Sequence, residues 1–576
     1  MAIQNAEVAQ TFSQLADLLE IQGANPFRIR AYRTAARTLI ELSQNVADVI
    51  EAHGKLYEYP GIGKDLASKI EEIVQTGHLQ AFDEAAEKTP KFLLDFLKIP
   101  TLGPKRVKIL HEKLGIKSLE DLQRVAESNE ILKVRGFGEK TRAEILEGIK
   151  KIQQEQKKHV LLFEAEEAAN LLSRYLSKAP GLQKLEVAGS FRRRKEVVAD
   201  LDILVTAKKS QPVMEHFLKF ENIAKVISKG STRSTVNLKS GLQVDLRVVD
   251  NNSYGAALLY FTGSKAHNIA VRARALKRGL KINEYGVFKG EKSIVSAKEE
   301  EIYELLKLPY IEPELRENRG EIEAAVKGQL PHLIQIKDLQ GDLHMHTTAS
   351  DGRNSLKEMA LAAKKMGYAY IGITDHSRRV AVAHGLDKKQ LLKQIDQIDE
   401  LNAEIQGITI LKSIEVDILE DGRLDLPDDV LEKLDYTVGA IHSYFQLPSQ
   451  KQTDRILRAM DNPHFRIFAH PMGRLIGKRE PYAMNVEKIM KAAKERSIIL
   501  ELNSQPERMD LSDTLCRMAK DLGVKIAIST DSHSVNQLNL MKYGVGQARR
   551  GWLEKKDVIN TLPLAKLKKI FQSGYE

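Results

Sequence analysis

Two aspartates stand inside an apolar strand pattern in the middle third of the 576-residue chain. Apolar residues take every second position from Ala199 to Val205, so the side chains of Asp200 and Asp202 point to the same side of a strand. Two like charges on one face cost repulsion and desolvation free energy unless cations lie between them. Carboxylate oxygens prefer hard divalent ions such as Mg²⁺, and the pattern therefore predicts a metal site.

A turn suited to phosphate binding precedes this strand. Gly189 and Ser190 offer backbone N–H groups and a hydroxyl, and a run of four basic residues follows at 192–195. Backbone N–H groups and cationic side chains are common partners of phosphate. A solvated basic turn would explain the charges but not two aspartates inside an apolar strand. The combination predicts phosphoryl chemistry beside a metal pair.

The order of these elements, Gly-Ser and then Asp-x-Asp on the next strand, resembles the nucleotidyltransferase superfamily that includes DNA polymerase beta. That superfamily needs a third carboxylate on a neighbouring strand, and Asp245 lies in a second alternating pattern at residues 243–249. The resemblance implies that Asp200, Asp202 and Asp245 are the catalytic carboxylates and that they hold Mg²⁺ or Mn²⁺.

A second stretch, from Tyr260 to Tyr285, is similar to the thumb of family X DNA polymerases. The resemblance implies that the start of this stretch lies along the sugar of an incoming dNTP and leaves no room for a 2′-hydroxyl. It assigns Asn268 to the base edge and Arg272 to the template side. The nucleotide-binding residues that it implies are Gly189, Ser190, Arg193, Tyr260, Phe261, Gly263, Asn268 and Arg272.

Together these residues predict a DNA-directed DNA polymerase that lengthens a primer by one nucleotide at its 3′-hydroxyl. Gapped or primed DNA and a dNTP are the expected partners, and short-gap filling in base excision repair or end joining is the expected task. A nucleotidyltransferase that acts without a template is the alternative, which the thumb resemblance opposes.

Three short glycine turns interrupt a helical pattern in the first 155 residues, at 59–63, 99–103 and 134–138. Each is followed, seven residues after its last glycine, by an apolar residue. The turns resemble helix-hairpin-helix units, although the second has Thr101 in place of a glycine. In such units the backbone approaches a phosphate without reading the base sequence. The implied DNA-binding positions are Gly61, Gly63, Gly103, Gly136 and Gly138.

Residues 64–69 resemble the part of the polymerase beta lyase domain whose lysine forms a Schiff base with a sugar aldehyde. Lys69 occupies the matching position, and Tyr32 matches another residue of that pocket. Phe27 and Asp65 depart from the basic and histidine residues with which that domain binds a 5′-phosphate. Lyase chemistry and a solvated helix lysine are both open interpretations of Lys69, because an amine must lose its proton to act as a nucleophile.

From about residue 339 the chain alternates strand and helix patterns roughly every thirty residues, as a parallel barrel does. Seven strands are expected, near Leu339, Ala369, Thr409, Thr437, Arg466, Ile498 and Lys525. Nearly every strand runs into a residue of a type that binds metal, and ligands at the carboxyl ends of barrel strands form an active site. These residues are His344, His346, Asp351, His376, Glu415, His442, His470, Asp531 and His533.

This set resembles the polymerase and histidinol phosphatase (PHP) domain, and all nine positions of its pattern are filled. Nine nitrogen and oxygen ligands exceed the needs of one ion, so two or three ions are expected, with Mn²⁺ or Zn²⁺ favoured over Mg²⁺ by imidazole. In a chain with DNA-binding turns, the expected activity is a 3′–5′ exonuclease, with abasic-site incision as a further activity. A small-molecule phosphatase and a structural metal-binding scaffold are the alternatives.

The composition agrees with a DNA-binding protein of the cytoplasm. A net charge of +10 and a pI near 9.1 suit a polyanionic partner, although the charge is spread along the chain. The single cysteine, Cys516, excludes an internal disulfide framework. Neither a secretion signal nor a membrane span is expected, since no long apolar run occurs. Nothing resembles a coiled coil, so a monomer is expected.

The expected fold is multidomain, with helical and α/β parts. The expected domains are a helical lyase-like domain (1–85), fingers with further helix-hairpin-helix units (86–155), a nucleotidyltransferase palm (156–250), a thumb (251–320), a linker (321–338) and a PHP domain built as a distorted (β/α)7 barrel (339–576).

Overall fold

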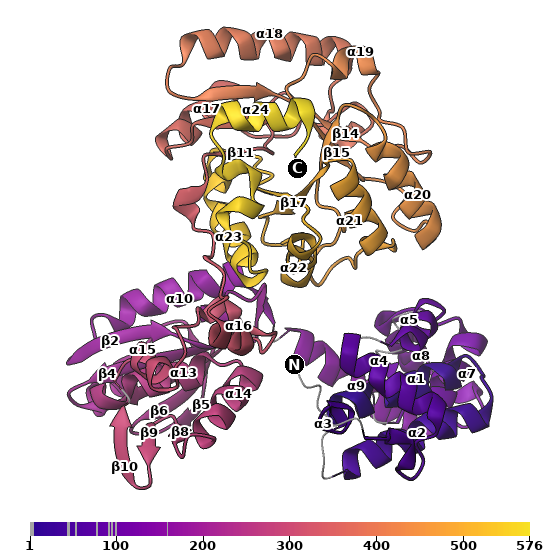
Figure 1. Cartoon of the computed structure of the whole chain (residues 1–576), viewed down its shortest axis with the longest axis vertical. Helices are drawn as coiled ribbons and strands as arrows, with labels where there is room; N and C mark the ends of the chain where they lie inside the picture. The colour runs from indigo at the N-terminus through magenta and orange to yellow at the C-terminus, as the bar shows by residue number, and fades with distance from the viewer. Residues whose placement is uncertain are drawn as a thin grey trace. The chain divides into compact units, whose positions relative to one another are not determined.

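A computed structural model describes residues 5–42, 46–51, 54–76, 79–89, 93, 96, 97, 99, 101–157, 159–295 and 297–575 (Figure 1). The chain divides into two compact units, Met1–Lys158 and His159–Glu576. The first unit is helical where it is described, and the second contains the five sheets of the described chain. The predicted mixture of helical and α/β parts is confirmed, while the finer domain boundaries stay predictions.

The first unit consists of helices packed around two apolar clusters. One cluster lies within residues 8–85, and the other joins Ile21 to residues 93–149. Local sequence fixes helix starts: the Asn25 side chain accepts the backbone N–H of Phe27 at 2.8 Å and so caps the second helix. The helices are α1 (Asn5–Ile21), α2 (Pro26–Glu41), α3 (Val46–Glu51), α4 (Lys64–Thr76), α5 (Gln80–Glu87), α7 (Pro104–Leu114), α8 (Leu119–Glu127) and α9 (Glu139–Lys157).

The palm, at the start of the second unit, is built on a five-stranded sheet. Its elements are β1 (Val160–Leu161), α10 (Leu162–Leu176), β2 (Leu182–Val187), α11 (Gly189–Arg192), β3 (Val197–Val198), β4 (Asp200–Ala207), α12 (Ser210–Phe217), β5 (Ile223–Lys229), β6 (Arg233–Leu238) and β7 (Gln243–Val249). The strand order is β2-β4-β7-β6-β5, and only β4 and β7 pair in parallel within this sheet. The alternation predicted for β4 is confirmed, because Leu201, Ile203 and Val205 are buried while Asp200 and Asp202 are partly exposed.

The thumb adds a small antiparallel sheet and helices. Its elements are α13 (Tyr254–Thr262), α14 (Lys265–Leu276), β8 (Lys281–Asn283), β9 (Gly286–Lys289), β10 (Lys292–Val295), α15 (Glu299–Leu305) and α16 (Glu321–Lys327). Although residues 321–338 were expected to be a linker, Ile322 and Ala325 of α16 share one apolar cluster with Leu259 and Val271 of the thumb. Helix α16 thus packs as part of the thumb.

The barrel is a ring of short parallel strands. They are β11 (Gly341–Asp342), β12 (Tyr370–Ile373), β13 (Thr409–Lys412), β14 (Glu415–Asp417), β15 (Thr437–Ala440), β16 (Phe465–Phe468), β17 (Ile499–Asn503) and β18 (Ile526–Ser529). A strand lies at each of the seven expected places, and the third is divided into β13 and β14. Parallel bridges from His376 to Glu415 and from Met345 to Ser532 join the two rows of strands.

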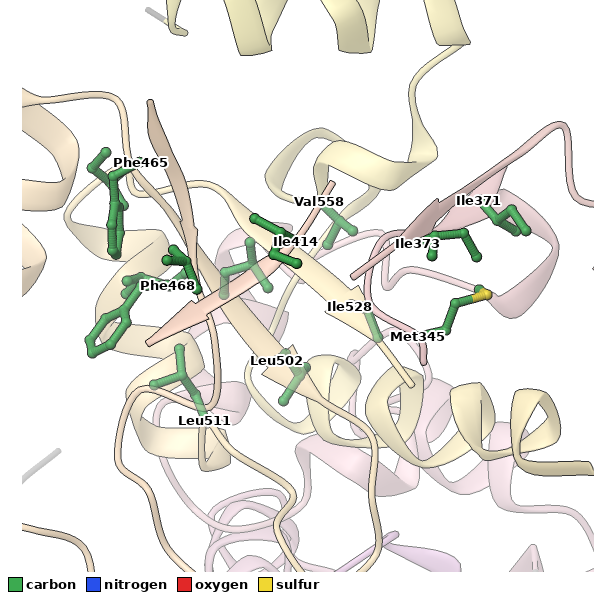
Figure 2. Close-up of a cluster of buried hydrophobic side chains, with 14 of the residues drawn as sticks. Met345, Ile371, Ile373, Ile414, Phe465, Phe468, Leu502, Leu511, Ile528 and Val558 are labelled. Atoms are coloured by element: carbon green, nitrogen blue, oxygen red, sulfur yellow. The ribbon is translucent and has the colours of Figure 1, made fainter. Parts of the chain in front are cut away.

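Helices surround these strands (Figure 1). They are α17 (Leu356–Lys365), α18 (Lys388–Glu404), α19 (Asp428–Leu431), α20 (Ser449–Met460), α21 (Val486–Glu495), α22 (Asp513–Asp521), α23 (Met541–Arg550) and α24 (Leu564–Ser573). Side chains of a strand alternate between its two faces. Ile371, Ile373 and Ile528 belong to the cluster shown in Figure 2, which also takes in residues of the helices. The alternate residues Tyr370 and Ala527 join Phe571 of α24 in a separate cluster.

Two further predictions concern single features. Among the helices in the described part of the chain, none is long and apolar enough to cross a membrane. Cys516 is buried in α22, and burial raises the pKa of its thiol well above the ordinary value. A thiol of this kind is a packing residue rather than a nucleophile.

Candidate active sites

The palm brings its three aspartates to one end of the sheet. Asp202 of β4 lies directly beside Asp245 in the parallel register with β7, and Asp200 lies two residues earlier on the same face. Gly189 begins α11 with a left-handed φ of +65°, and a Cβ at this position would lie 2.7 Å from Oδ2 of Asp202. The turn and the carboxylate therefore touch, and glycine is required at that point.

Burial and neighbouring carboxylates raise the pKa of two of the three aspartates. Burial, followed by the charges of Asp200 and Asp245, raises the pKa of Asp202 to about 7, and burial and Asp245 raise the pKa of Asp200. Asp245 is held by hydrogen bonds from Arg233 Nη2 at 3.1 Å and Thr235 Oγ1 at 2.5 Å. A divalent cation would compensate the remaining negative charge, so the residues fit the metal that the sequence predicts.

The basic residues of the turn are already engaged. Arg193, predicted to bind triphosphate, donates from Nε to Glu317 at 3.0 Å and from Nη1 to the carbonyl of Thr262 at 2.5 Å. Arg192 makes two hydrogen bonds to buried Glu299, at 2.7 and 3.0 Å. Ser190 lies in α11 beside them. No local pattern predicted the two glutamates, which lie more than 100 residues downstream.

The thumb residues gather around the turn between α13 and α14. A Cβ on Gly263 would lie 3.1 Å from Nη1 of Arg193, so this turn lies against the basic residues of the palm. Tyr260 is exposed at the end of α13 and makes an edge contact with Phe261, with ring centroids 5.1 Å apart. Asn268 Nδ2 donates to the carbonyl of Tyr260 at 2.7 Å. The structure thus brings four of the predicted nucleotide-binding residues to one turn.

Arg272 lies apart from this group, exposed on the following turns of α14. Nearby His267 is fully buried, with Nδ1 2.7 Å from Glu321 and Nε2 2.8 Å from the Tyr303 hydroxyl. This histidine holds α14 to α15 and α16 and faces the thumb core.

Each predicted DNA-binding turn ends where a helix begins. Gly63, Gly103 and Gly138 immediately precede α4, α7 and α9. Gly61 and Gly136 are left-handed, with φ of +78° and +96°, which explains the choice of glycine. The apolar residues seven positions on, Ile70, Leu110 and Ile145, are fully buried. The three turns therefore leave helix N-termini with backbone N–H groups that suit phosphate.

The lyase-like residues lie in the first of these helices and its neighbour. Lys69 forms an ion pair with Asp65 one helical turn earlier. Tyr32 is buried against Phe12, with ring centroids 5.3 Å apart. An amine that attacks a carbonyl must be neutral, whereas the Lys69 amine donates to a carboxylate here. Lyase chemistry at Lys69 stays a prediction.

The nine barrel residues converge at the carboxyl ends of the strands or in the loops that follow. Glu415 is central: its Oε1 lies 3.0 Å from His470 Nε2 and 3.2 Å from His442 Nε2, and its Oε2 lies 2.8 Å from His376 Nδ1. His346 Nε2 lies 3.1 Å from Asp531 Oδ1. The donor atoms form three overlapping groups, which are His346, Asp351, His376 and His533; His344, His346 and Asp531; and His376, Glu415 and His442.

Several of these donors lack a hydrogen-bond partner despite their burial. They include His346 Nδ1, His376 Nδ1 and Glu415 Oε2 among the described residues. Buried polar atoms without partners are rare and need an explanation, and ligands of a metal ion are one. His376 Nδ1 and Glu415 Oε2 lie 2.8 Å apart without hydrogen-bond geometry, as two ligands of one ion do. The residues therefore fit a metal centre.

The charges of the barrel site also suit a metal centre. Burial, followed by the charges of neighbouring His376 and His533, lowers the pKa of His346 to about 4. Burial also opposes the charge of His344, but the surrounding carboxylates, Glu501 first, raise its pKa well above the ordinary value. Without a metal, protons therefore charge some of these histidines and leave others neutral. Divalent ions can bind in place of those protons.

Two acidic residues that position the metal-binding histidines are not among the residues predicted from the sequence. Glu501, in the middle of β17, accepts from His344 Nδ1 at 2.7 Å and from the backbone N–H of His470 at 2.7 Å. Asp417 lies 3.2 Å from Nδ1 of His442. A carboxylate on the far nitrogen fixes the tautomer of a ligating histidine. Both acids lie within strands, and an acid inside an apolar strand pattern is the one signal that pointed to them.

Four families match parts of the sequence. Residues 257–317 match the DNA polymerase beta thumb, and residues 342–505 match the PHP domain. Residues 3–79 match the Helix-hairpin-helix domain, and residues 93–151 match the SAM-like Helix-hairpin-helix tandem.

Some curated relatives match about a third of the chain, and another matches nearly all of it. Probable phosphatases of Thermoanaerobacter sp. (strain X514) and Caldanaerobacter subterraneus subsp. tengcongensis are 32% and 30% identical over 204 and 203 residues, which is 33% of this chain and 78% and 75% of those proteins. The DNA polymerase/3′-5′ exonuclease PolX of Bacillus subtilis (strain 168) is 36% identical over 562 residues, 97% of each chain. The chain therefore belongs to the bacterial family X DNA polymerases that carry a C-terminal PHP domain.

Proposed function

We propose that this chain is a DNA-directed DNA polymerase that extends primers at short gaps, with a 3′–5′ exonuclease in its PHP barrel. The parallel register that sets Asp202 beside Asp245, next to the Gly189 turn, carries the polymerase assignment. The Bacillus relative, which matches along the whole chain, has both activities in its name.

In the palm, Asp200, Asp202 and Asp245 would hold Mg²⁺ or Mn²⁺, which when bound makes a 3′-hydroxyl more acidic and offsets charge on the triphosphate. Gly189 lets the backbone N–H groups of α11 come close to phosphate oxygens. Arg193 supplies positive charge beside them. Tyr260 is exposed at the thumb turn, where it would contact the nucleotide.

In the barrel, the nine histidine, aspartate and glutamate ligands would hold two or three Mn²⁺ or Zn²⁺ ions, which when bound supply a nucleophile and polarise a phosphoester. Glu501 and Asp417 orient the ligating imidazoles. The helix starts after Gly63, Gly103 and Gly138 would hold the DNA backbone without reading its sequence.

The phosphatase relatives support phosphomonoesterase activity as a second candidate function, and only for the barrel, because they match 33% of this chain. The match of the Bacillus relative across polymerase and barrel favours a DNA phosphodiester as the substrate. We further place the protein in the cytoplasm as a monomer that fills gaps during base excision repair or end joining, and abasic-site incision is a further activity of the barrel.

A 5′-labelled primer on a one-nucleotide gap, incubated with Mn²⁺ with and without dNTPs, tests both assignments. Asp200→Ala/Asp202→Ala should abolish extension and spare shortening, and His344→Ala/His346→Ala should do the reverse. If the histidine variant still degrades the primer, the barrel is not the nuclease. If the aspartate variant still extends it, the palm assignment fails.

A further inference from the structure

The segment that leads from the phosphate-binding turn to the metal strand of the palm is bound at both ends by the barrel. Arg550 Nη1, at the end of α23, donates to the backbone carbonyl of Arg193 at 2.7 Å. Arg474, in the loop after β16, donates two hydrogen bonds to Glu196 at 2.7 and 3.1 Å, and Gln547 Nε2 adds a third at 3.2 Å. Arg474 thus joins the barrel to the palm.

The middle of the segment lies against the same helix. Arg194 is left-handed, with φ of +55°, and a Cβ on Gly546 of α23 would lie 3.5 Å from the Arg194 side chain. Arg194 Nη1 lies 3.3 Å from Glu166, whose other oxygen accepts from the Tyr543 hydroxyl at 2.5 Å and from Lys542. Helix α23 therefore contacts Arg193, Arg194 and Glu196 of the segment.

Apolar packing supports these polar contacts. Met509, Leu540 and Tyr543 of the barrel belong to the same buried cluster as the strands and helices of the palm. Trp552 likewise joins the apolar cluster of the thumb. Buried apolar area stabilises an interface in a way that surface ion pairs do not, so α23 has a fixed place on the palm.

Arg550 also reaches the guanidinium of Arg193 through a shared carboxylate. Oε1 of Glu317 accepts from Arg193 Nε and from Arg550 Nη1, each at 3.0 Å. The side chains are 11%, 13% and 3% exposed for Arg193, Glu317 and Arg550. The direction of the Arg193 guanidinium is thus set by Glu317 together with the carbonyl of Thr262, and Arg550 holds Glu317 in turn.

The cluster carries excess positive charge. Asp513 Oδ2 accepts from Arg550 Nη2 at 2.7 Å and from Arg319 Nη1 at 3.0 Å. Three guanidinium groups, those of Arg193, Arg319 and Arg550, face the two carboxylates of Glu317 and Asp513, which leaves one positive charge. Removal of Arg550 would bring the cluster to neutrality and leave Glu317 to neutralise Arg193. A triphosphate beside Arg193 would then meet less positive charge.

We propose that Arg550 of the PHP barrel is a positioning residue for the nucleotide site of the polymerase. It holds the backbone and, through Glu317, the guanidinium of Arg193 in the orientation that receives the dNTP phosphates. This role rests on the proposed polymerase function. It makes the barrel a part of the polymerase site in addition to its own chemistry.

The full-length protein tests this role on a one-nucleotide gap under steady-state conditions. Arg550→Ala should raise KM for the dNTP about tenfold, as expected for loss of hydrogen bonds to charged groups. The change in kcat should be smaller, and KM for the DNA and the exonuclease rate should stay as in the wild type. Unchanged exonuclease activity shows that the barrel is folded.

Arg549→Ala is the matched control on the same helix. Arg549 donates to Glu314 at 2.6 Å and to the carbonyl of Ile334 at 3.2 Å, so it joins the barrel to the thumb without contacting Arg193. This variant should leave KM for the dNTP unchanged. An equal rise in both variants would overturn the proposal, because any loosening of the interface would then suffice.

Two milder variants carry the test if Arg550→Ala does not fold. Glu317→Gln adds one positive charge to the cluster but should still raise KM for the dNTP, because the Arg193 guanidinium loses the carboxylate that sets its direction. Arg550→Lys should restore only part of the wild-type value. A KM within twofold of the wild type in Arg550→Ala, or in both milder variants, would overturn the role of Arg550. Absence of templated extension by the wild type would instead overturn the polymerase assignment on which the role rests.

Discussion

Replacement of Gly189 by alanine should damage the palm site in a way that the structure quantifies. A Cβ at this position would lie 2.7 Å from Asp202 Oδ2, about 0.7 Å closer than the 3.4 Å at which ordinary van der Waals contact begins. The residue also has a φ of +65°, and a left-handed conformation costs an L-residue about 1–2 kcal/mol. Asp202 must move by a comparable distance to relieve the overlap.

A shift of this size at a metal ligand has a large effect on rate. A misplacement of about 1 Å can cost about 100-fold, so Gly189→Ala should lower kcat/KM for gap extension by roughly 10- to 100-fold. The assay is single-nucleotide extension at saturating Mg²⁺ and DNA. Thermal unfolding should show a loss of about 1–2 kcal/mol from backbone strain.

Gly181→Ala separates the two effects. Gly181 also lies in the palm with a left-handed φ of +78°, but nothing lies within 4 Å of its Cβ position. This control should show a similar loss of stability with extension intact. Wild-type extension by Gly189→Ala, or an equal loss of extension in both variants, would refute the argument that contact with Asp202 is what matters.

Three further predictions address other parts of the chain. Glu501→Gln should weaken metal binding at the barrel by about 10- to 100-fold, because His344 loses its carboxylate partner. The metal content of the protein after dialysis measures this loss, and unchanged primer extension is the control. Glu299→Gln should cost about 3 kcal/mol at neutral pH in urea unfolding, because buried Arg316 loses its charge partner. Burial opposes ionisation of Glu299, but Arg316 and Arg192 outweigh burial and lower the pKa of this carboxyl. The difference in stability between wild type and variant should therefore shrink as the pH falls below about 4. A difference that persists at lower pH would contradict the ion-pair explanation. Gly136→Ala, at φ +96°, should weaken DNA binding equally for all sequences in a fluorescence titration, whereas a sequence-dependent loss would argue against phosphate contacts.

Much of the fold could be predicted because periodicity reports burial directly. The alternation around Asp200 and Asp202 and the buried Ile70 both follow from rules that involve neighbouring residues alone. The barrel ligands could be placed together because parallel strands end at one face, whatever the details of packing. Asp245 could be predicted because the resemblance calls for a third carboxylate on a neighbouring strand, and its strand carries the same alternation.

Contacts between distant residues could not be predicted in this way. Arg474 follows His470 and resembles a DNA-facing residue, yet its partner Glu196 lies 278 residues earlier in the chain. Glu501 is one acid within an apolar strand, and nothing local distinguishes it from a metal ligand. The division of the third barrel strand after Lys412 likewise depends on pairing with other strands, because β13 pairs with β12 and β14 pairs with β15, and no single segment encodes this.

The packing of α23 on the palm has a practical consequence for taking the enzyme apart. A fragment that ends near residue 338 would expose the apolar surface that Leu540 and Tyr543 cover and would leave Glu166 and Glu196 without their barrel partners. Such a fragment is expected to aggregate or lose activity for reasons unrelated to nuclease chemistry. Point substitutions, which keep this surface covered, are the sounder way to assign each activity to its own half of the enzyme.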